Sequence, residues 1–182
     1  MRKVTYGGAS SLDNFIAGPD EAIDWLRWSE DSAAISAASW KGADTMLMGR
    51  KTFEFAQKMG GGPEMKGIRS YVFSRRLDSV PEGVELVRED AAAFVRRLKA
   101  EEGRDIIVMG GGELGAALIE AGLVDEIGLA IHPVLLGGGT PLFHAFSHRI
   151  ELELIEARPI ARECVLVRYR VLNPVDGPSR SA

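Results

Sequence analysis

The segment Ile106-Ile107-Val108-Met109-Gly110-Gly111-Gly112-Glu113-Leu114-Gly115 joins an apolar run to the start of a helix. Its first four residues are continuously apolar, as expected of a strand that is covered on both faces. Beyond the glycines, apolar residues recur at helical spacing from Leu114 to Ala121, and Gly122 ends that helix. Such a turn points free backbone N–H groups and the positive end of a helix dipole into one crevice, where phosphate is favoured.

The three consecutive glycines make this turn more specific than a lone glycine would. Glycine loses more conformational freedom on folding than any other residue, so this position needs either space or unusual dihedral angles. A pyrophosphate lying on the backbone would need both. The run does not match the dinucleotide fingerprint G-x-G-x-x-G, and it is not a P-loop, because no Gly-Lys-Ser/Thr follows.

A second segment, Thr45-Met46-Leu47-Met48-Gly49-Arg50-Lys51-Thr52-Phe53, has the same organisation. We expect a short buried strand over 45–48 and a helix over 51–58. Gly49 lets the backbone approach a ligand, Thr52 offers a hydroxyl and an N–H, and Arg50 and Lys51 supply positive charge. The alternative is a plain strand–turn–helix with solvated basic residues. Two such turns in one small domain predict one elongated ligand, and a dinucleotide fits.

Basic residues also follow the next predicted strand, 70–74, as Ser74-Arg75-Arg76. If this strand lies beside the one at 45–48, Ser74 and Arg75 share a carboxyl edge with Arg50, where open α/β sheets bind their ligands. Guanidinium groups make paired contacts with phosphate oxygens, so the 2′-phosphate of NADP is the natural ligand. The alternative is a charged loop with no ligand.

The rest of the chain predicts one α/β domain over residues 1–172, with strands and helices in alternation and right-handed crossovers. We expect further strands at 2–9 and 126–136, the latter interrupted at Pro133, and a loop at 10–20. A helix should run from Asp20 or Glu21 to Trp40, and another over 91–98 with Asp90 as N-cap and Gly103 as C′ residue. Segments 150–157 and 163–171 predict an antiparallel hairpin at the sheet edge. Residues 173–182 are expected to form a mobile tail.

Composition excludes several classes of function. The chain has 182 residues, 46% of them apolar and 26% charged, and a net charge of −4, which argues against nucleic acid or anionic membrane as a partner. No apolar run has the length of a membrane span or a signal peptide, so we expect a cytoplasmic protein.

Cys164 is the only cysteine, which rules out an intramolecular disulfide and a cysteine-rich zinc site. His144 and His148 have the i, i+4 spacing that could hold a metal on a helix, but no carboxylate or cysteine accompanies them. We therefore expect no metal site.

Five stretches together resemble the dihydrofolate reductase superfamily, and more closely its branch with the reductase domain of bacterial riboflavin biosynthesis, which acts on a pyrimidine. The stretches are 9–17, 48–53, 108–114, 122–127 and 132–143. They extend from near the N-terminus to residue 143, and the expected terminal hairpin agrees with the resemblance.

The resemblance implies a three-layer fold with a mixed, mainly parallel central sheet and a homodimer. It also implies an NADPH-dependent reductase that transfers hydride to a small pteridine-like or pyrimidine-like heterocycle or to a carbonyl acceptor, similar to 5-amino-6-ribosylaminouracil-phosphate reductase. The implied coenzyme contacts fall into four groups. They are Gly49, Arg50, Lys51 and Thr52 at one end; Ser74 and Arg75 at the 2′-phosphate; Gly110, Gly111, Gly112, Glu113 and Leu114 at the pyrophosphate and nicotinamide ribose; and Ala9, Ile16 and Gly18 near the nicotinamide. A cis Gly110–Gly111 peptide is typical of the family and is expected here.

Catalytic residues are less well defined. Folate-reducing members carry a carboxylate on the first helix, where this chain has Asp24, Glu30 and Asp31 without a gap-free match. We take Asp24 as the candidate; the alternative is a first-turn acid that favours the helix dipole. Glu113 stands where folate reducers often carry a basic residue, which favours the pyrimidine-reductase-like branch. The zinc-binding pattern of a deaminase domain is missing from the sequence.

Other residues near these motifs have two interpretations each. Trp25 and Trp28, three apart on the expected helix, could line an aromatic pocket or pack in the core. Asp13 is most simply a turn residue, with a role in shaping the substrate loop as the alternative. Because no carboxylate aligns with the family's, the chain could also be a non-catalytic NADP(H)-binding sensor or interaction module.

Overall fold

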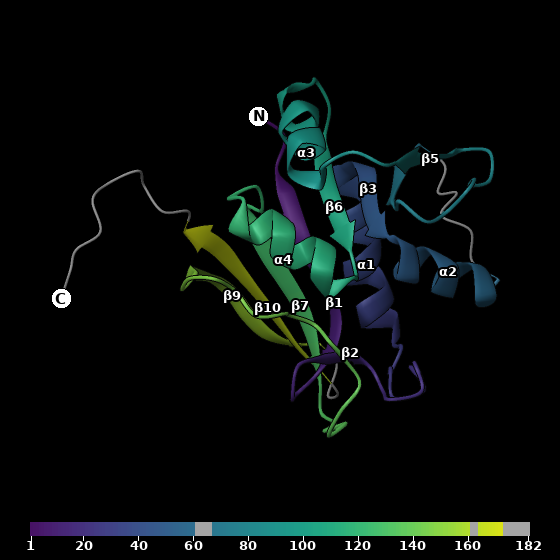
Figure 1. Ribbon diagram of the computed structural model, residues 1–182. Coiled ribbons are helices and arrows are strands. Elements are labelled where there is room, and N and C mark those ends of the chain that lie inside the picture. Colours follow the sequence, from purple (N-terminus) through teal and green to yellow (C-terminus); the bar gives the residue numbers. More distant parts are fainter. Residues whose placement is uncertain (61–66, 161–163, 173–182) are drawn as a thin grey trace.

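A computed structural model describes residues 1–60, 67–160 and 164–172. Its centre is an eight-stranded sheet in the order β5-β4-β3-β6-β1-β7-β10-β9, shown in Figure 1. The strands are β1 (Val4–Ser11), β3 (Ala43–Gly49), β4 (Arg69–Phe73), β5 (Val84–Val87), β6 (Asp105–Met109), β7 (Glu126–His132), β9 (Glu151–Ile160) and β10 (Cys164–Leu172). Strands β1 and β3 to β7 pair in parallel, and β10 is antiparallel to β7 and β9. The predicted mixed, mainly parallel sheet with a hairpin at its edge is confirmed.

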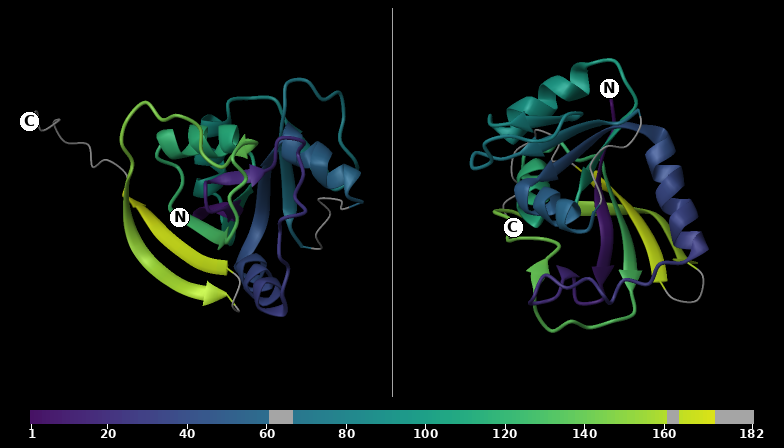
Figure 2. Two further views of the ribbon diagram at one scale, coloured as in Figure 1. Left: turned by 90° about the horizontal axis from the view of Figure 1, so that it is seen from below. Right: turned by 90° about the vertical axis from the view of Figure 1, so that its right-hand side faces the viewer.

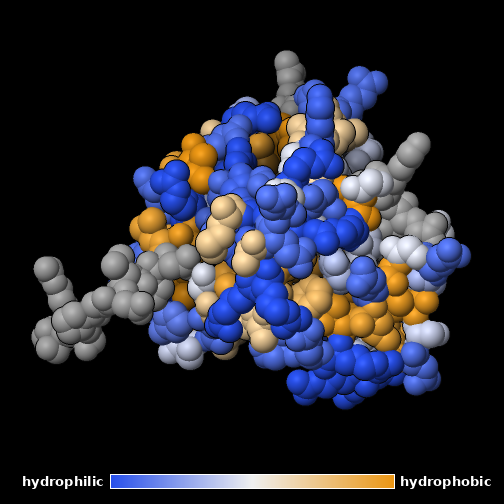
Figure 3. All heavy atoms as spheres, turned by 90° about the horizontal axis from the view of Figure 1, so that it is seen from above, coloured by the Kyte–Doolittle hydropathy of each residue, from blue (hydrophilic) through white to orange (hydrophobic). Residues whose placement is uncertain are grey.

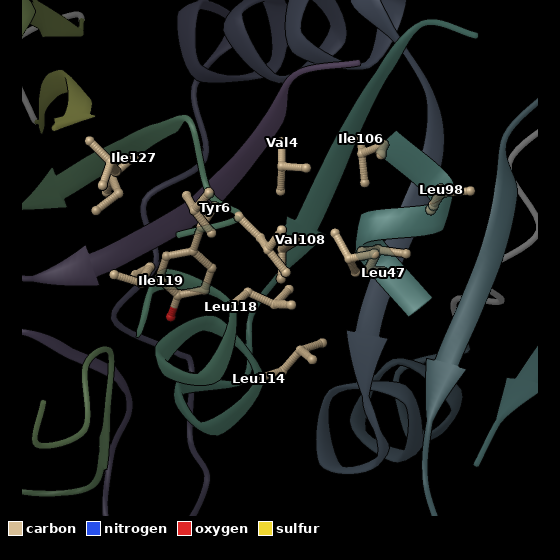
Figure 4. Close-up of a cluster of buried hydrophobic side chains, with 14 of the residues drawn as sticks. Val4, Tyr6, Leu47, Leu98, Ile106, Val108, Leu114, Leu118, Ile119 and Ile127 are labelled. Atoms are coloured by element: carbon tan, nitrogen blue, oxygen red, sulfur yellow. The ribbon is translucent and has the colours of Figure 1, made fainter. Parts of the chain in front are cut away.

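Helices cover both faces of this sheet and make the fold three-layered (Figure 2). Helices α3 (Ala91–Ala100) and α4 (Gly112–Glu120) lie on one face, and α1 (Glu30–Gly42) and α2 (Arg50–Lys58) lie on the other. The alternation of side chains along β3 serves both layers. Leu47 points into the core under α3 and α4, whereas Met46 and Met48 pack with Phe53 of α2. Figure 4 shows the first of these cores, with Tyr6 and Val108 of the sheet facing Leu118 of α4.

Helices α3 and α4 form where their apolar periodicity predicts them. Asp90 is the N-cap of α3, and its carboxylate accepts a 2.8 Å hydrogen bond from the Ala93 N–H. Gly122 follows α4 in the left-handed conformation, with φ of 66°. The prediction that Gly103 is the C′ residue of α3 is wrong, because the chain leaves the helix at Glu101 in an extended conformation. Gly103 instead permits close packing: a Cβ there would stand 2.8 Å from Asp44 Oδ2.

Helix α1 begins about nine residues later than predicted, at Glu30. Ser29 supplies the start signal: its hydroxyl accepts from the Ser32 N–H, and the Ser32 hydroxyl accepts from the Ser29 N–H. This reciprocal capping box satisfies two backbone donors that a helix end otherwise leaves open. Residues 18–29 form turns, in which Glu21 takes a positive φ of 59°.

Short strands account for most of the remaining differences. Strand β5 was not predicted; it is four residues long and pairs only with β4. Strand β7 ends at His132, before Pro133, instead of continuing to 136, because proline cannot donate to a strand ladder. The predicted loop at 10–20 contains β2 (Phe15–Ala17), which forms a small antiparallel sheet with β8 (Thr140–Pro141). The predicted tail at 173–182 lies outside the described residues.

The amino ends of the parallel strands carry a largely hydrophilic surface, which Figure 3 shows from above. Beneath it, buried Arg2 binds Asp44 and Thr45 of β3, and buried Lys99 of α3 binds Asp125 and the Leu123 carbonyl. The Arg2 contacts tie the N-terminal residues to β3, and the Lys99 contacts tie α3 to the segment that leads into β7. Both lie at the edge opposite the predicted ligand crevice. Within the described ranges, no helix combines the length and apolar character needed to cross a membrane.

Candidate functional site

The two glycine turns meet at the carboxyl edge of the sheet. Strands β3 and β6 are neighbours in parallel register, with Leu47 beside Val108, so Gly49 and Gly110 emerge side by side. A Cβ added to Gly110 would stand 3.1 Å from the Thr52 hydroxyl oxygen, and one on Gly111 would stand 3.4 Å from the same atom. The start of α2 therefore contacts the turn before α4, as the prediction of one shared crevice requires.

Both helices have a glycine as N-cap and therefore no side-chain cap. The N-cap of α2 is Gly49 and that of α4 is Gly111, and neither makes a side-chain capping hydrogen bond. The first-turn N–H groups of these helices have no acceptor inside their own helix, so an acceptor from elsewhere suits them. Two such ends in contact form a site that favours an anion.

The expected cis peptide at Gly110–Gly111 is wrong, because no cis bond occurs in the described residues. Both glycines take the left-handed conformation, with φ of 57° and 71°. These two positive φ angles turn the chain from β6 into α4 with trans peptides, and a non-proline cis bond would cost a further ~3 kcal/mol. Glycine is therefore needed at these two positions because of their positive φ angles and not because of a cis peptide.

The third glycine of this run is required by packing. A Cβ on Gly112 would come within 2.7 Å of the His144 ring and 2.9 Å of the Pro141 carbonyl oxygen. Gly112 is therefore needed for packing against the segment after β8. Leu114 has its side chain in the core, so only its backbone can contact a ligand, whereas Glu113 is exposed on the first turn of α4.

Strand β4 brings the second basic group to the same edge. Gly49 lies beside Phe73 in parallel register, so Arg50 and Ser74 follow paired residues, and the predicted adjacency of these strands is confirmed. The Ser74 hydroxyl oxygen accepts 3.1 Å hydrogen bonds from the N–H groups of Arg76 and Leu77 and so shapes the turn. Arg75 is exposed. The Arg50 guanidinium forms an ion pair with Glu54, a residue the motif analysis missed although its i, i+4 spacing signals it.

Ala9, Ile16 and Gly18 belong to the β1–β2 region, and β1 is the neighbour of β6 on the side away from β3. Ala9 lies in β1 beside Ala130 of β7, Ile16 lies in β2, and the Gly18 N–H donates to the Ala22 carbonyl at 2.9 Å. Gly139 approaches this segment so closely that a Cβ there would stand 2.1 Å from the Ala17 carbonyl oxygen. The end of β2 and the segment after β7 are thus held together.

Asp13 organises that junction. Its carboxylate accepts hydrogen bonds from the Ser11 hydroxyl at 2.6 Å, the Gly137 N–H at 2.8 Å and the Leu136 N–H at 3.1 Å. The Ser11 bond first, and the two backbone bonds with it, lower the pKa of Asp13 below its usual value. Asp13 therefore shapes this loop as an ionised residue, which favours the second of the two sequence interpretations over a simple turn residue.

The sequence matches one protein family over nearly the whole chain. The model of the RibD C-terminal domain matches residues 2–166. The chain belongs to the RibD C-terminal domain family. The Bacillus subtilis (strain 168) relative named uncharacterized protein YyaP is 31% identical over 180 residues, which are 93% of this chain and 95% of the relative.

Solved structures show the same fold. A putative riboflavin biosynthesis protein from Shewanella sp. PV-4 has a TM-score of 0.82 at 23% identity, covering 94% of this chain and 99% of its own. The deaminase/5-amino-6-(5-phosphoribosylamino)uracil reductase of Thermotoga maritima has a TM-score of 0.70 at 16% identity, and the match covers 94% of this chain but 57% of that protein. Dihydrofolate reductase from Enterococcus faecalis, solved with NADP(H), has a TM-score of 0.69 at 15% identity, covering 93% of this chain and 96% of that one.

The predicted catalytic region differs from expectation. Asp24 is not on a helix; it is exposed in the 18–29 segment, while Glu30 and Asp31 occupy the first turn of α1. Trp25 and Trp28 are consequently not a helical pair. The Trp25 ring meets His132 edge-on at 5.3 Å between centroids, and Trp28 is 72% exposed.

The surroundings of the histidines also differ from those that their sequence spacing suggested. His144 and His148 are in a non-helical segment, so their i, i+4 spacing places no pair on a helix. At the end of β7, the His132 Nδ1 lies 3.3 Å from both the Arg27 N–H nitrogen and the Cys164 sulfur. These contacts anchor the 18–29 segment to the carboxyl edge of the sheet.

Proposed function

We propose that the protein is an NADPH-dependent reductase. The observation that carries this proposal is the contact between Thr52, at the start of α2, and Gly110 and Gly111, before α4. It brings two uncapped helix ends together at one edge of the sheet, where their first-turn N–H groups suit an anion. When bound, NADPH supplies the hydride, and the residues of the chain supply binding and alignment.

The residues at this edge fit an anionic dinucleotide. The backbones of Gly49 to Thr52 and of Gly110 to Leu114 would hold one phosphate group or the pyrophosphate. The Ser74 hydroxyl, whose oxygen already accepts from the backbone, still has a hydrogen to donate, and Arg75 is exposed beside it. We assign these two residues to the 2′-phosphate and Ala9, Ile16 and Gly18 to the nicotinamide end.

The acceptor we propose is a small heterocycle of pteridine or pyrimidine type, or a carbonyl compound. The Thermotoga maritima neighbour is named as a uracil-derivative reductase and the Enterococcus faecalis neighbour as a folate reductase, which supports this class. We propose Asp24 as the acid that protonates the acceptor.

We also propose a homodimer, for which light scattering should give twice the chain mass of 19.7 kDa.

A non-catalytic NADP(H)-binding module is the second candidate. It is favoured by the fact that no Asp or Glu is buried among the described residues, so no shielded acid stands near the crevice. Tight NADPH binding without coenzyme oxidation across a panel of pterin, pyrimidine and carbonyl acceptors supports the module. Oxidation with one of them supports the reductase.

Coenzyme preference tests the assignment directly. We expect the wild-type protein to bind NADPH far more tightly than NADH in a calorimetric titration. Arg75→Ala should reduce this preference by about tenfold or more, because a charge-assisted contact to the 2′-phosphate contributes about 1.5–3 kcal/mol. An Arg75→Ala protein with an unchanged NADPH/NADH ratio would remove Arg75 from the site.

A further inference from the structure

Arg50, the first residue of α2, is paired with Glu54 one turn further along the helix. The Arg50 Nη1 donates to both carboxylate oxygens of Glu54, at 2.9 Å to Oε1 and 2.7 Å to Oε2. The spacing i, i+4 places the two side chains on one face of the helix. Their side chains are 29% and 39% exposed, so the pair is partly sheltered and holds the arginine in one position.

This pairing uses one end of the guanidinium and leaves the other available. Throughout the described part of the chain, the Arg50 Nε and Nη2 atoms make no hydrogen bond. The Nε–H and Nη2–H groups form a planar fork that matches two oxygens of a phosphate. Arg50 follows Gly49, the N-cap of α2, so the helix end that meets the Gly110–Gly111 turn carries this fork.

We propose that Glu54 is a positioning residue for the coenzyme: it holds Arg50 so that the Nε–Nη2 fork meets a coenzyme phosphate. The inference rests on the proposed NADPH site, which supplies that phosphate. A free arginine loses rotamer freedom when a ligand immobilises it, and Glu54 removes this cost before the ligand arrives. The Glu54 carboxylate also repels a phosphate. A substitution at Glu54 that weakens coenzyme binding shows that positioning dominates, and one that strengthens binding shows that repulsion dominates.

Two substitutions separate positioning from charge. Glu54→Ala removes the support for Arg50, and we expect NADPH to bind about three- to tenfold more weakly in a calorimetric titration, as one newly immobilised side chain predicts. Glu54→Gln removes the negative charge but keeps an amide oxygen that accepts from Nη1, so its affinity should stay within about twofold of the wild type. Thermal unfolding checks that both variants fold, since a single i, i+4 pair contributes little to the stability of a helix.

The Arg50→Ala background tests that Glu54 acts through Arg50. There, Glu54→Ala should weaken NADPH binding no further. Binding by Glu54→Ala that equals or exceeds the wild type overturns the inference, and so does a loss that persists without Arg50; both outcomes leave the reductase proposal intact if the wild type binds NADPH. A wild-type protein that binds neither NADPH nor NADH overturns the reductase proposal and the role of Glu54 together.

Discussion

At the scale of single residues, the glycines of this chain serve two separate purposes. Gly110 and Gly111 adopt left-handed backbone conformations that turn β6 into α4. Gly112 and Gly115 have no such conformation but leave no space for a side chain. Sequence alone indicates that glycine is needed at these positions, but it does not distinguish a backbone requirement from a packing requirement. That distinction depends on neighbours that are distant along the chain, such as Tyr6 and His144.

Gly115 offers a direct test of the packing role. A Cβ at this position would stand 2.4 Å from the ring of Tyr6, which is fully buried and whose hydroxyl donates to the Leu142 carbonyl. We expect Gly115→Ala to lower the free energy of unfolding by about 1–3 kcal/mol through overpacking. The control is Gly128→Ala, where a Cβ meets its first neighbour at 3.8 Å. Denaturant unfolding that finds Gly115→Ala as stable as the control would refute the close contact with Tyr6.

At the scale of elements, helix starts are decided by caps and not by where apolar residues first appear. The helix expected from residue 20 or 21 would include the apolar residues Ile23 and Leu26, but both precede the helix. Ser29 and Ser32 close a reciprocal pair that fixes the start of α1 at Glu30. The consequence for the site is that Asp24 and Trp25 lie in an irregular segment above the carboxyl edge.

Because Ser29 caps the start of α1, replacing it should lower the stability of the protein. Ser29→Ala removes the acceptor for the Ser32 N–H and should cost about 1 kcal/mol. Ser39→Ala is the matched control, because the Ser39 hydroxyl is exposed and bonds only the Ile35 carbonyl of its own helix. Urea unfolding measures both variants. Equal stability of the two would contradict a helix that begins after Ser29.

Elements with strong local signals were predictable, and weakly signalled ones were not. Helix α4 shows a clean apolar period between glycines, and α3 adds the Asp90 cap. Strand β5 has four residues and pairs with β4 alone, so its identity comes from tertiary pairing. Gly103 resembled a helix terminator but serves contact with Asp44.

At the scale of the whole molecule, the site depends on strand order. Strand β3 lies between β4 and β6, which places Arg50, Ser74 and Gly110 at one edge. Local sequence patterns identified each of these groups. Their proximity depends on which strands pair, and no local sequence signal gives that pairing. The bond between Asp13 and residues 136–137 is of the same kind, because 123 residues separate Asp13 from Leu136. Glu54 carries no ligand-binding motif of its own, and only its i, i+4 spacing from Arg50 signals the pair.

The central claim is that segments distant in sequence bind NADPH together at the carboxyl edge. An amide-resolved NMR titration of the wild-type protein with NADPH tests it most directly. We predict that the backbone signals of Gly49 to Thr52, Ser74, Arg75 and Gly110 to Leu114 shift along one binding curve, while those of Arg2 and Lys99 at the opposite edge stay in place. Saturation that leaves the glycine-turn signals unmoved, or shifts only the amino edge, would contradict the account.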